Sequence, residues 1–375
     1  KRINNYFRAN AYVEYEIIKD LKVKVMGGFL TDDYSNEQFN GSRSRTGNKY
    51  RSDGVNASVQ NKSTQQWVNE NTLTYKTAFD KDEKHKFDIL LGQTMQGSRY
   101  RNTYMKATHI PNEHLGINGF GEGSPVVSTY NSAEWTLMSF LSRINYNYDN
   151  RYYFTATFRA DGSSKFAKNN RWGYFPAASA GWIVDEEAFW PRNKVVSSLK
   201  LRASYGLTGN NGIGLYDTYG SYNSAYQYNG MSTTTTGEMP NSNLTWESTT
   251  QVNAGLDMGL ADDRVRVSFD YYDKVTRNLL FDVTLPNTTG YGSVVSNVGK
   301  VRFYGVDLAI SSVNISRGDF TWTTDFTYNF NMNKVLKLPD NGNVRNRMDG
   351  ITIGDGSQFG GIAEGERMGR IYGYK

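Results

Sequence analysis

The stretch YFRANAYVEYEI, residues 6–17, alternates apolar and polar side chains with a period of two. Its odd positions carry Phe7, Ala9, Ala11, Val13, Tyr15 and Ile17, and its even positions carry Arg8, Asn10, Tyr12, Glu14 and Glu16. A period of two places alternate side chains on opposite faces of a β-strand. The stretch therefore predicts a strand with one apolar and one polar face.

The same period recurs along the chain, most clearly at 264–271, where Val267 and Phe269 alternate with Arg266 and Ser268. Weaker copies lie at 21–31, 65–79, 87–95, 135–148, 151–160, 176–184, 199–208, 246–260, 301–311 and 320–332. Many of these segments run to ten or more residues, against about five or six in soluble sheets and about ten in transmembrane barrels. The pattern predicts an all-β fold with twelve antiparallel strands in a transmembrane β-barrel, or an open curved sheet.

The connections between these segments alternate in length. Residues 149–150 and 261–263 form short connections, whereas 35–63, 100–132, 209–245 and 281–299 form long ones. Outer-membrane barrels have short periplasmic turns and long extracellular loops. We therefore predict that the long connections are extracellular, and that the aromatic run NYNYDNRYYF at 145–154 lies at the membrane interface on the short-turn side.

Composition narrows the class of protein. Hydrophobic residues make up 38% of the 375 residues and the mean hydropathy is -0.63; lipid contact on one face of each strand accounts for this low apolar content. The net charge of +5 comes from scattered cations, so no nucleic-acid partner is expected. The absence of Cys excludes disulfides and thiolate metal sites.

No catalytic, cofactor or metal site is expected. His109 and His114 flank Pro111 in a predicted solvated loop, and His85 lies in a charged turn where we expect it to be solvated. The run at 185–200 predicts a single helical turn. The Tyr-rich segment 216–230 has the composition of an adaptable recognition loop, and equally of a flexible surface loop. Its candidate substrate-binding residues are Tyr216, Tyr219, Tyr222, Tyr226 and Tyr228.

The run RYYFTATFRADGSSKFAKNNRWGYFPAASAGWIVDEEAF, residues 151–189, contains two long motifs, at 161–166 and 170–182. It resembles the barrel of SusC/RagA-type TonB-linked outer-membrane proteins of Bacteroidetes, and LKLRASYGLTGN, NVGKVRFYGVDLAI and EGERMGRIYGYK extend the resemblance in order along the chain. The matching motif residues are Asp161, Gly162, Ser163, Ser164, Phe166, Asn170, Arg171, Trp172, Gly173, Phe175, Pro176, Gly181 and Trp182. We interpret the run as a strand, a tight loop and a returning strand whose Ala178, Ala180, Trp182 and Val184 face lipid.

The resemblance implies that residues 1–375 are one partial barrel domain, part of a barrel of about 22 strands, with the plug domain and terminal strands outside this fragment. It implies a non-enzymatic role in the Gram-negative outer membrane, in contact with lipid and without a cofactor. The implied partners are a SusD-like surface lipoprotein and TonB, which binds through an N-terminal region. The implied function is TonB-dependent uptake of large oligomers, most of all glycans, with oligopeptides as the alternative cargo.

Two further classes stay open at this stage. A passive porin would share the alternating strands and unequal connections, and differs by lacking a plug and a TonB-binding segment. A secreted carbohydrate-active protein on a β-scaffold would need convergent carboxylates and a soluble core.

Overall fold

The computed structural model of the protein describes residues 1–191, 195–228, 231–348, 351–352, 358–359 and 361–370. The chain divides into two compact units. The first comprises Lys1–Tyr15, Val23–Thr72 and Gln93–Met138, and the second comprises Glu16–Lys22, Leu73–Gly92 and Ser139–Lys375. Within the described residues, no helix is long and apolar enough to span a membrane.

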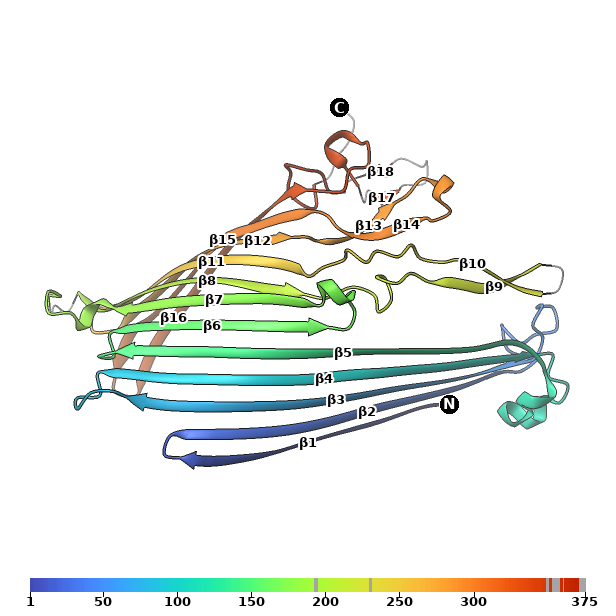
Figure 1. Ribbon diagram of the computed structural model, residues 1–375, viewed down its shortest axis with the longest axis horizontal. Helices are drawn as coiled ribbons and strands as arrows, with labels where there is room; N and C mark the ends of the chain where they lie inside the picture. Colours follow the sequence, from blue (N-terminus) through green and yellow to red (C-terminus); the bar gives the residue numbers. More distant parts are fainter. Residues whose placement is uncertain (192–194, 229–230, 349–350, 353–357, 360, 371–375) are drawn as a thin grey trace. The chain divides into compact units, whose positions relative to one another are not determined.

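Twelve strands form one sheet in the order β1-β2-β3-β4-β5-β6-β7-β8-β11-β12-β15-β16 (Figure 1). Their bounds are β1 Arg2–Ile18, β2 Leu21–Asn40, β3 Asn56–Ala78, β4 His85–Thr108, β5 Ser124–Tyr148, β6 Tyr152–Ser163, β7 Trp172–Ile183, β8 Val196–Asn210, β11 Glu247–Leu260, β12 Val265–Arg277, β15 Lys300–Arg317 and β16 Phe320–Lys337. The pairs from β6 onward are antiparallel. The predicted all-β class and its twelve strands are confirmed.

The connections carry short elements of their own. Among the described residues there are three two-stranded pairs: β9 Tyr222–Tyr228 with β10 Met231–Thr236, β13 Leu280–Thr284 with β14 Ser293–Asn297, and β17 Ile351–Thr352 with β18 Gln358–Phe359. The 3-10 helices are η1 Glu113–Glu122, η2 Lys168–Asn170, η3 Val184–Glu186, η4 Asn287–Thr289 and η5 Val344–Asn346. The helix η3 is the single turn predicted within 185–200, whereas the paired strands in the connections were not predicted.

Several strands are longer than predicted. The strands β2 to β5 have 20, 23, 24 and 25 residues, so the connections between β2 and β3 and between β4 and β5 shrink to 41–55 and 109–123. The added segments, such as TDDYSNEQFN at 31–40, are polar on both faces and lack the period of two. Strand pairing needs only backbone partners, and a segment in water needs no apolar face, so the strands continue where the pattern stops.

In the first unit, side-chain hydrogen bonds fix the connections between the long strands. The Glu113 carboxylate at the start of η1 accepts hydrogen bonds from the Ser42 N–H at 2.8 Å and the Ser42 hydroxyl at 2.9 Å. These bonds lower the pKa of the Glu113 carboxyl. The Lys106 ammonium pairs with Asp53 at 2.7 Å. The connections 41–55 and 109–123 are therefore held together by polar contacts.

The second unit has few fully buried side chains. Strand residues are mostly exposed or half-buried, and the largest buried side chains are Phe166, Leu244, Val335 and Leu338. Phe166 and Leu244 lie in the connections after β6 and β8, Leu338 follows β16, and Val335 lies in β16, so three of these four side chains lie outside the strands.

Candidate functional site

Side chains on the two faces of the second unit's strands differ in polarity. In β12, Phe269 and Tyr271 are exposed on one face, while Ser268 and Asp270 on the other face bind neighbouring polar side chains. The strand register aligns these faces, because Gly255 lies opposite both Arg202 of β8 and Asp270 of β12. The predicted apolar and polar faces of β12 are confirmed.

Arg202 is the centre of the polar face. Its guanidinium donates to both oxygens of Asp257, at 2.7 and 2.9 Å, and pairs with Asp270 at 3.0 Å. The Ser268 hydroxyl donates to Asp257 at 2.8 Å. A bidentate guanidinium–carboxylate pair fixes geometry as well as contributing energy. The network therefore holds β8, β11 and β12 in one register at this height.

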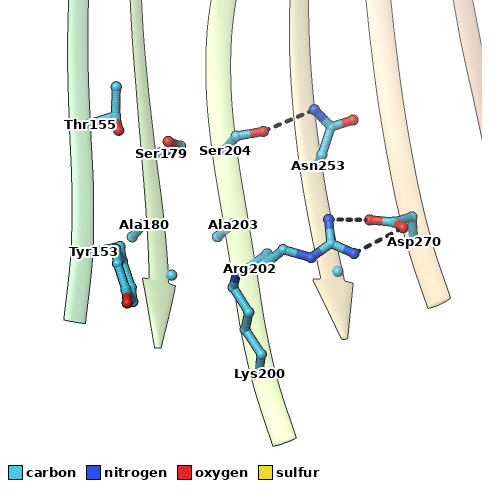
Figure 2. A pocket seen from close by; sticks show the side chains of 12 residues that line it. Tyr153, Thr155, Ser179, Ala180, Lys200, Arg202, Ala203, Ser204, Asn253 and Asp270 are labelled. Atoms are coloured by element: carbon cyan, nitrogen blue, oxygen red, sulfur yellow. Dashed lines mark hydrogen bonds and ion pairs between the residues drawn. The ribbon is translucent and has the colours of Figure 1, made fainter. Parts of the chain in front are cut away.

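Gly255 gives the Arg202 guanidinium the space it occupies. The residue lies between Arg202 and Asp270 in the register, and a Cβ there would lie 2.9 Å from the Arg202 Cζ. Real Cβ atoms essentially never approach so closely. Gly at position 255 thus lets the side chain of Arg202 cross β11 to reach Asp270 (Figure 2).

A hollow of about 310 Å³ lies on the polar face around this network. Its polar lining comes from Tyr153, Ser179, Lys200, Ser204 and Asn253 (Figure 2). The Asn253 amide donates to the Ser204 hydroxyl at 2.9 Å, and the Lys200 ammonium lies 5.8 Å from the centre of the Tyr153 ring. Charged side chains and uncharged donors both line the hollow, so it suits a polar occupant.

A second hollow, of about 490 Å³, shares Tyr153 and Thr155 with the first. Lys76, Lys86 and Asp88 are among its lining residues. One carboxylate oxygen of Asp88 is buried and has no hydrogen-bond partner among the described residues. The polar face thus offers adjoining charged recesses of both signs.

Aromatic rings lie in two groups along β5 to β7. Near the short turns, Tyr152 stacks on Trp182 with ring centres 6.3 Å apart, and Tyr148 lies 6.0 Å from Tyr152. At the other end of β7, Trp172 stacks on Phe140 of β5 with ring centres 6.0 Å apart. These two groups have the positions expected of aromatic girdles at the two interfaces of a bilayer.

The distance between the two groups fits a membrane. Gly162, which lies opposite Trp172, is ten residues after Tyr152. At about 3.3 Å per residue and a tilt of about 40°, these residues span roughly 25 Å, the height of the apolar band of outer-membrane barrels. The hairpin of β6 and β7 therefore has the height of the hydrocarbon layer.

The family-motif residues form this hairpin and its connection. Asp161, Gly162 and Ser163 end β6, Ser164 and Phe166 lie in the connection, Asn170 ends η2, and Arg171 precedes β7. The remaining motif residues, all in β7, are Trp172, Gly173, Phe175, Pro176, Gly181 and Trp182. Arg159 holds the carboxylate of Asp161 through two bonds of 2.8 Å. The predicted arrangement of strand, tight loop and strand is confirmed.

The lipid-facing residues predicted for β7 need one correction. Ala178 and Ala180 are exposed and share a face with Trp182, as expected for alternate residues of one strand. Val184 is only 5% exposed, because it lies in η3 beyond the end of β7, where the alternation no longer applies.

The motif connection also anchors the long connection that carries the Tyr-rich segment. The Lys165 ammonium donates to the carbonyl oxygens of Asn211 and Ile213, at 3.4 and 3.2 Å. The Thr218 hydroxyl donates to the Lys165 carbonyl at 3.2 Å. Trp246 donates its indole N–H to the Arg171 carbonyl at 2.9 Å. Both ends of the connection are thereby fixed to the same short loop.

An aromatic cluster supports these bonds. Trp246 lies 5.3 Å from Phe166 and 5.4 Å from Phe175 between ring centres. Phe166 is fully buried. A Cβ at Gly209 would overlap the ring of Phe175, so the small residue in β8 leaves room for this ring. The motif thus builds a small core under the long connection.

The candidate substrate-binding tyrosines are only partly described. Tyr216, Tyr219 and Tyr222 are 50%, 58% and 79% exposed. The side chains of Tyr226 and Tyr228 lie outside the described residues. The three described rings are available to a partner or cargo, and their role as contacts stays a prediction.

The structure confirms the prediction for two histidines and corrects the prediction for the third. His109 and His114 are exposed in the predicted loop. His85 is instead half-buried at the start of β4, where its ring hydrogen-bonds the Tyr146 hydroxyl at 2.8 Å and lies 4.7 Å from Tyr148. The expectation that His85 is solvated is wrong, because the aromatic group near the short turns packs against it.

Comparison with known proteins gives the family. Residues 2–364 match the family model described as TonB dependent receptor-like, beta-barrel. The chain belongs to this family. The second unit's polar and apolar faces are accordingly the lumen and lipid faces of an outer-membrane barrel wall.

Two curated relatives and one solved structure support the assignment. TonB-dependent receptor P3 of Formosa agariphila is 34% identical over 98% of this chain. TonB-dependent receptor SusC of Bacteroides thetaiotaomicron is 37% identical over 60% of it. The RagAB peptide importer in its closed-closed state superposes with a TM-score of 0.79 and 25% identity, covering 90% of this chain and 37% of that chain. The expected SusC/RagA resemblance and outer-membrane localisation are confirmed.

This chain spans 37% of the length of receptor P3 and 25% of the length of SusC. The sequence alone did not reveal the Arg202 network or the anchoring role of Lys165 and Trp246. Charged residues at lumen-facing positions of 199–208, 246–260 and 264–271 were the available signal. Their pairing depends on strand register, which alternation alone does not fix.

Proposed function

We propose that the protein containing this barrel wall imports large polar oligomers across the outer membrane with energy delivered by TonB. Membership of the TonB-dependent receptor-like family supports this role most strongly. In this proposal the barrel wall acts as a binding and conducting surface and catalyses no reaction. A SusD-like surface lipoprotein covers the extracellular mouth, and TonB acts through an N-terminal region.

We propose oligosaccharides as the cargo. The exposed rings of Tyr216, Tyr219 and Tyr222 support this choice, because an aromatic face with a hydroxyl at its edge can stack on a sugar and bond its hydroxyls. Oligopeptides are the second candidate. The observation in their favour is the similarity of the fold to the RagAB peptide importer, at a TM-score of 0.79.

Uptake measurements separate these possibilities. Cells that lack the full-length gene are compared with complemented cells for uptake of fluorescent oligosaccharides and of fluorescent oligopeptides. The proposal expects uptake of oligosaccharides that depends on the gene and stops when a protonophore collapses the proton gradient. Uptake of peptides alone would show that the cargo is oligopeptides and not oligosaccharides. Uptake that persists with the protonophore would indicate a passive porin, and shortened products with the purified protein would indicate an enzyme.

Membrane topology gives an independent test. The described chain has no Cys, so a single Cys at Tyr222 or at Asp262 in the full-length protein is a clean reporter once other thiols are removed. An impermeant maleimide should label position 222 in intact cells and leave position 262 unlabelled until the outer membrane is opened. The opposite pattern would reverse the proposed orientation.

A further inference from the structure

A hollow of about 430 Å³ lies on the lipid face of β6, β7 and β8. Ala180 and Ala203 lie side by side in the register and form its floor. Phe154, Trp182 and Leu201 are the larger side chains around it. Phe154 is 46% exposed and Leu201 is 39% exposed, so the apolar walls are open to the membrane. A recess with a floor of methyl groups and walls of larger apolar side chains fits a flexible hydrocarbon chain.

The register explains why the face is recessed here. One row across the strands reads Phe154, Ala180, Ala203 and Ala254. The next row toward the short turns reads Tyr152, Trp182, Leu201 and Leu256. Three adjacent alanines thus lie beside a row of large side chains, which leaves a depression of one side-chain depth.

The depth of the hollow in the membrane determines what can fill it. The hollow begins at the girdle formed by Tyr152 and Trp182 and extends toward the middle of the apolar band. Its surface is continuous with the lipid-facing surface of the wall. The alanine floor and the Phe154 and Leu201 side chains offer water no hydrogen bonds, and an empty space would leave these lining atoms without dispersion contacts.

We propose that this hollow is a binding site for one acyl chain of a phospholipid in the leaflet nearest the short turns. The acyl chain lies over Ala180 and Ala203, between the Phe154 ring and the Leu201 side chain. The glycerol and headgroup lie at the level of the Tyr152 and Trp182 rings, where amphipathic aromatic residues meet the membrane interface. The alanine floor lies on the opposite face of the sheet from the side chains of the Arg202 network, although Arg202 and Tyr153 also line the hollow.

Photocrosslinking tests the site. The full-length protein is reconstituted in bilayers of phosphatidylethanolamine that contain a trace of the same lipid with a diazirine in one acyl chain. After illumination, mass spectrometry maps the modified residues. The proposal expects crosslinks concentrated on the segments around Phe154, Ala180 and Ala203. Crosslinks spread evenly over the lipid face of all strands would overturn it.

Two variants sharpen the result. Ala203→Phe fills the hollow and should lower crosslinking of the Ala180 segment several-fold, because the acyl chain loses its floor. Leu308→Phe is the control, since Leu308 lies on the same face of β15 outside the hollow. It should leave the crosslinks unchanged. Equal yields from both variants would contradict the proposal.

A second experiment distinguishes lipid from protein. A photoreactive amino acid at position 201 should crosslink to lipid in intact membranes. A crosslink from this position to a second polypeptide would show that protein occupies the hollow, and the acyl-chain site would be rejected. The wild-type crosslink map is informative by itself, so the conclusion does not depend on the folding of Ala203→Phe.

Discussion

The hairpin of β6 and β7 and the hairpin of β4 and β5 cross the same kind of membrane with very different lengths. β6 and β7 have 12 residues each, and the aromatic groups at their two ends are about 25 Å apart. β4 and β5 have 24 and 25 residues. Only about ten of these are needed to cross the hydrocarbon layer. The bilayer therefore sets where a strand must be apolar, but it does not set where the strand ends.

What ends the shorter hairpin is the small core in its connection. Phe166 is fully buried and lies 5.3 Å from Trp246. Replacing Phe166 with Ala should lower the free energy of unfolding by about 3 to 5 kcal/mol, because it leaves a cavity between buried side chains. Denaturant unfolding of the full-length protein in detergent measures this loss. Tyr50→Ala is the control, since Tyr50 is 87% exposed in the connection before β3, and it should change stability little.

Arg substitutions at two heights on one face of β5 test whether only part of each long strand crosses the hydrocarbon layer. Ile144 lies midway between Phe140 and Tyr148, which belong to the two aromatic groups, whereas Val126 lies near the other end of the strand. Ile144→Arg should destabilise the barrel by about 2 to 4 kcal/mol, the value for Arg at the midplane of a bilayer. Val126→Arg should have an effect within about 0.5 kcal/mol, as for a surface position.

The measurement is unfolding of both variants in lipid bilayers. A large cost at both positions would mean that the whole of β5 contacts lipid, and the comparison between the hairpins would fail. A small cost at both would mean that this face of β5 does not contact lipid at all.

Charge is tolerated on the lumen face at the height where it is excluded from the lipid face. Arg202→Gln should lower stability by about 1 kcal/mol, because its ion pairs are more than a third exposed and water screens them. Arg266→Gln is a matched control. Arg266 is 73% exposed and lies 4.0 Å from Asp263, so its loss should have no measurable effect. Equal losses of stability in the two variants would show that the ion pairs of Arg202 contribute no more than an exposed surface pair.

The smallest expected effect concerns the short-turn end of the β6–β7 hairpin. Glu187 accepts hydrogen bonds from the Tyr152 hydroxyl at 2.5 Å and the Trp182 indole at 3.1 Å, and pairs with Arg151 at 3.2 Å. The Tyr152 bond, followed by the Trp182 bond, lowers the pKa of the Glu187 carboxyl. A lowered folded-state pKa stabilises the fold above the unfolded value of about 4.3. That stabilisation disappears as the pH falls through the lower, folded-state pKa.

Unfolding midpoints of the wild type and Glu187→Gln should therefore differ above the unfolded pKa and converge as the pH falls through the lower, folded-state pKa. Glu186→Gln serves as the control, since Glu186 is exposed in the same turn. If the difference between wild type and Glu187→Gln stayed constant through the acidic range, the hydrogen bonds to the ionised carboxylate would not be its source.

The sequence predicted the membrane-spanning part of each strand better than the strand itself. The predicted segment 87–95 lies within β4, which runs from His85 to Thr108. Its apolar alternation, with Phe87, Ile89 and Leu91, exists only where lipid contacts one face. Beyond this part both faces meet water, so residues such as Arg99 and Asn102 give no periodic signal while the backbone pairing continues.

The candidate site was less accessible from sequence for a different reason. Arg202, Asp257 and Asp270 come from three strands separated by long or short connections, and nothing local marks them as partners. Their contact depends on strand register, because shifting a strand by one residue would move its charged side chain to the lipid face. The motif connection was recognisable, but its binding of residues 211–246 depends on backbone carbonyl groups, which any sequence supplies.

The fixed ends of the 211–246 connection have a consequence for how such proteins diversify. Lys165, Thr218 and Trp246 secure its two ends to the motif loop, and the Asn241 side chain donates to the Val295 carbonyl at 2.8 Å. The stretch between these anchors can change in length and composition without altering the strands that cross the membrane. It is an exchangeable cassette, and grafting the corresponding stretch of a relative between residues 219 and 240 should transfer recognition while the recipient barrel still assembles.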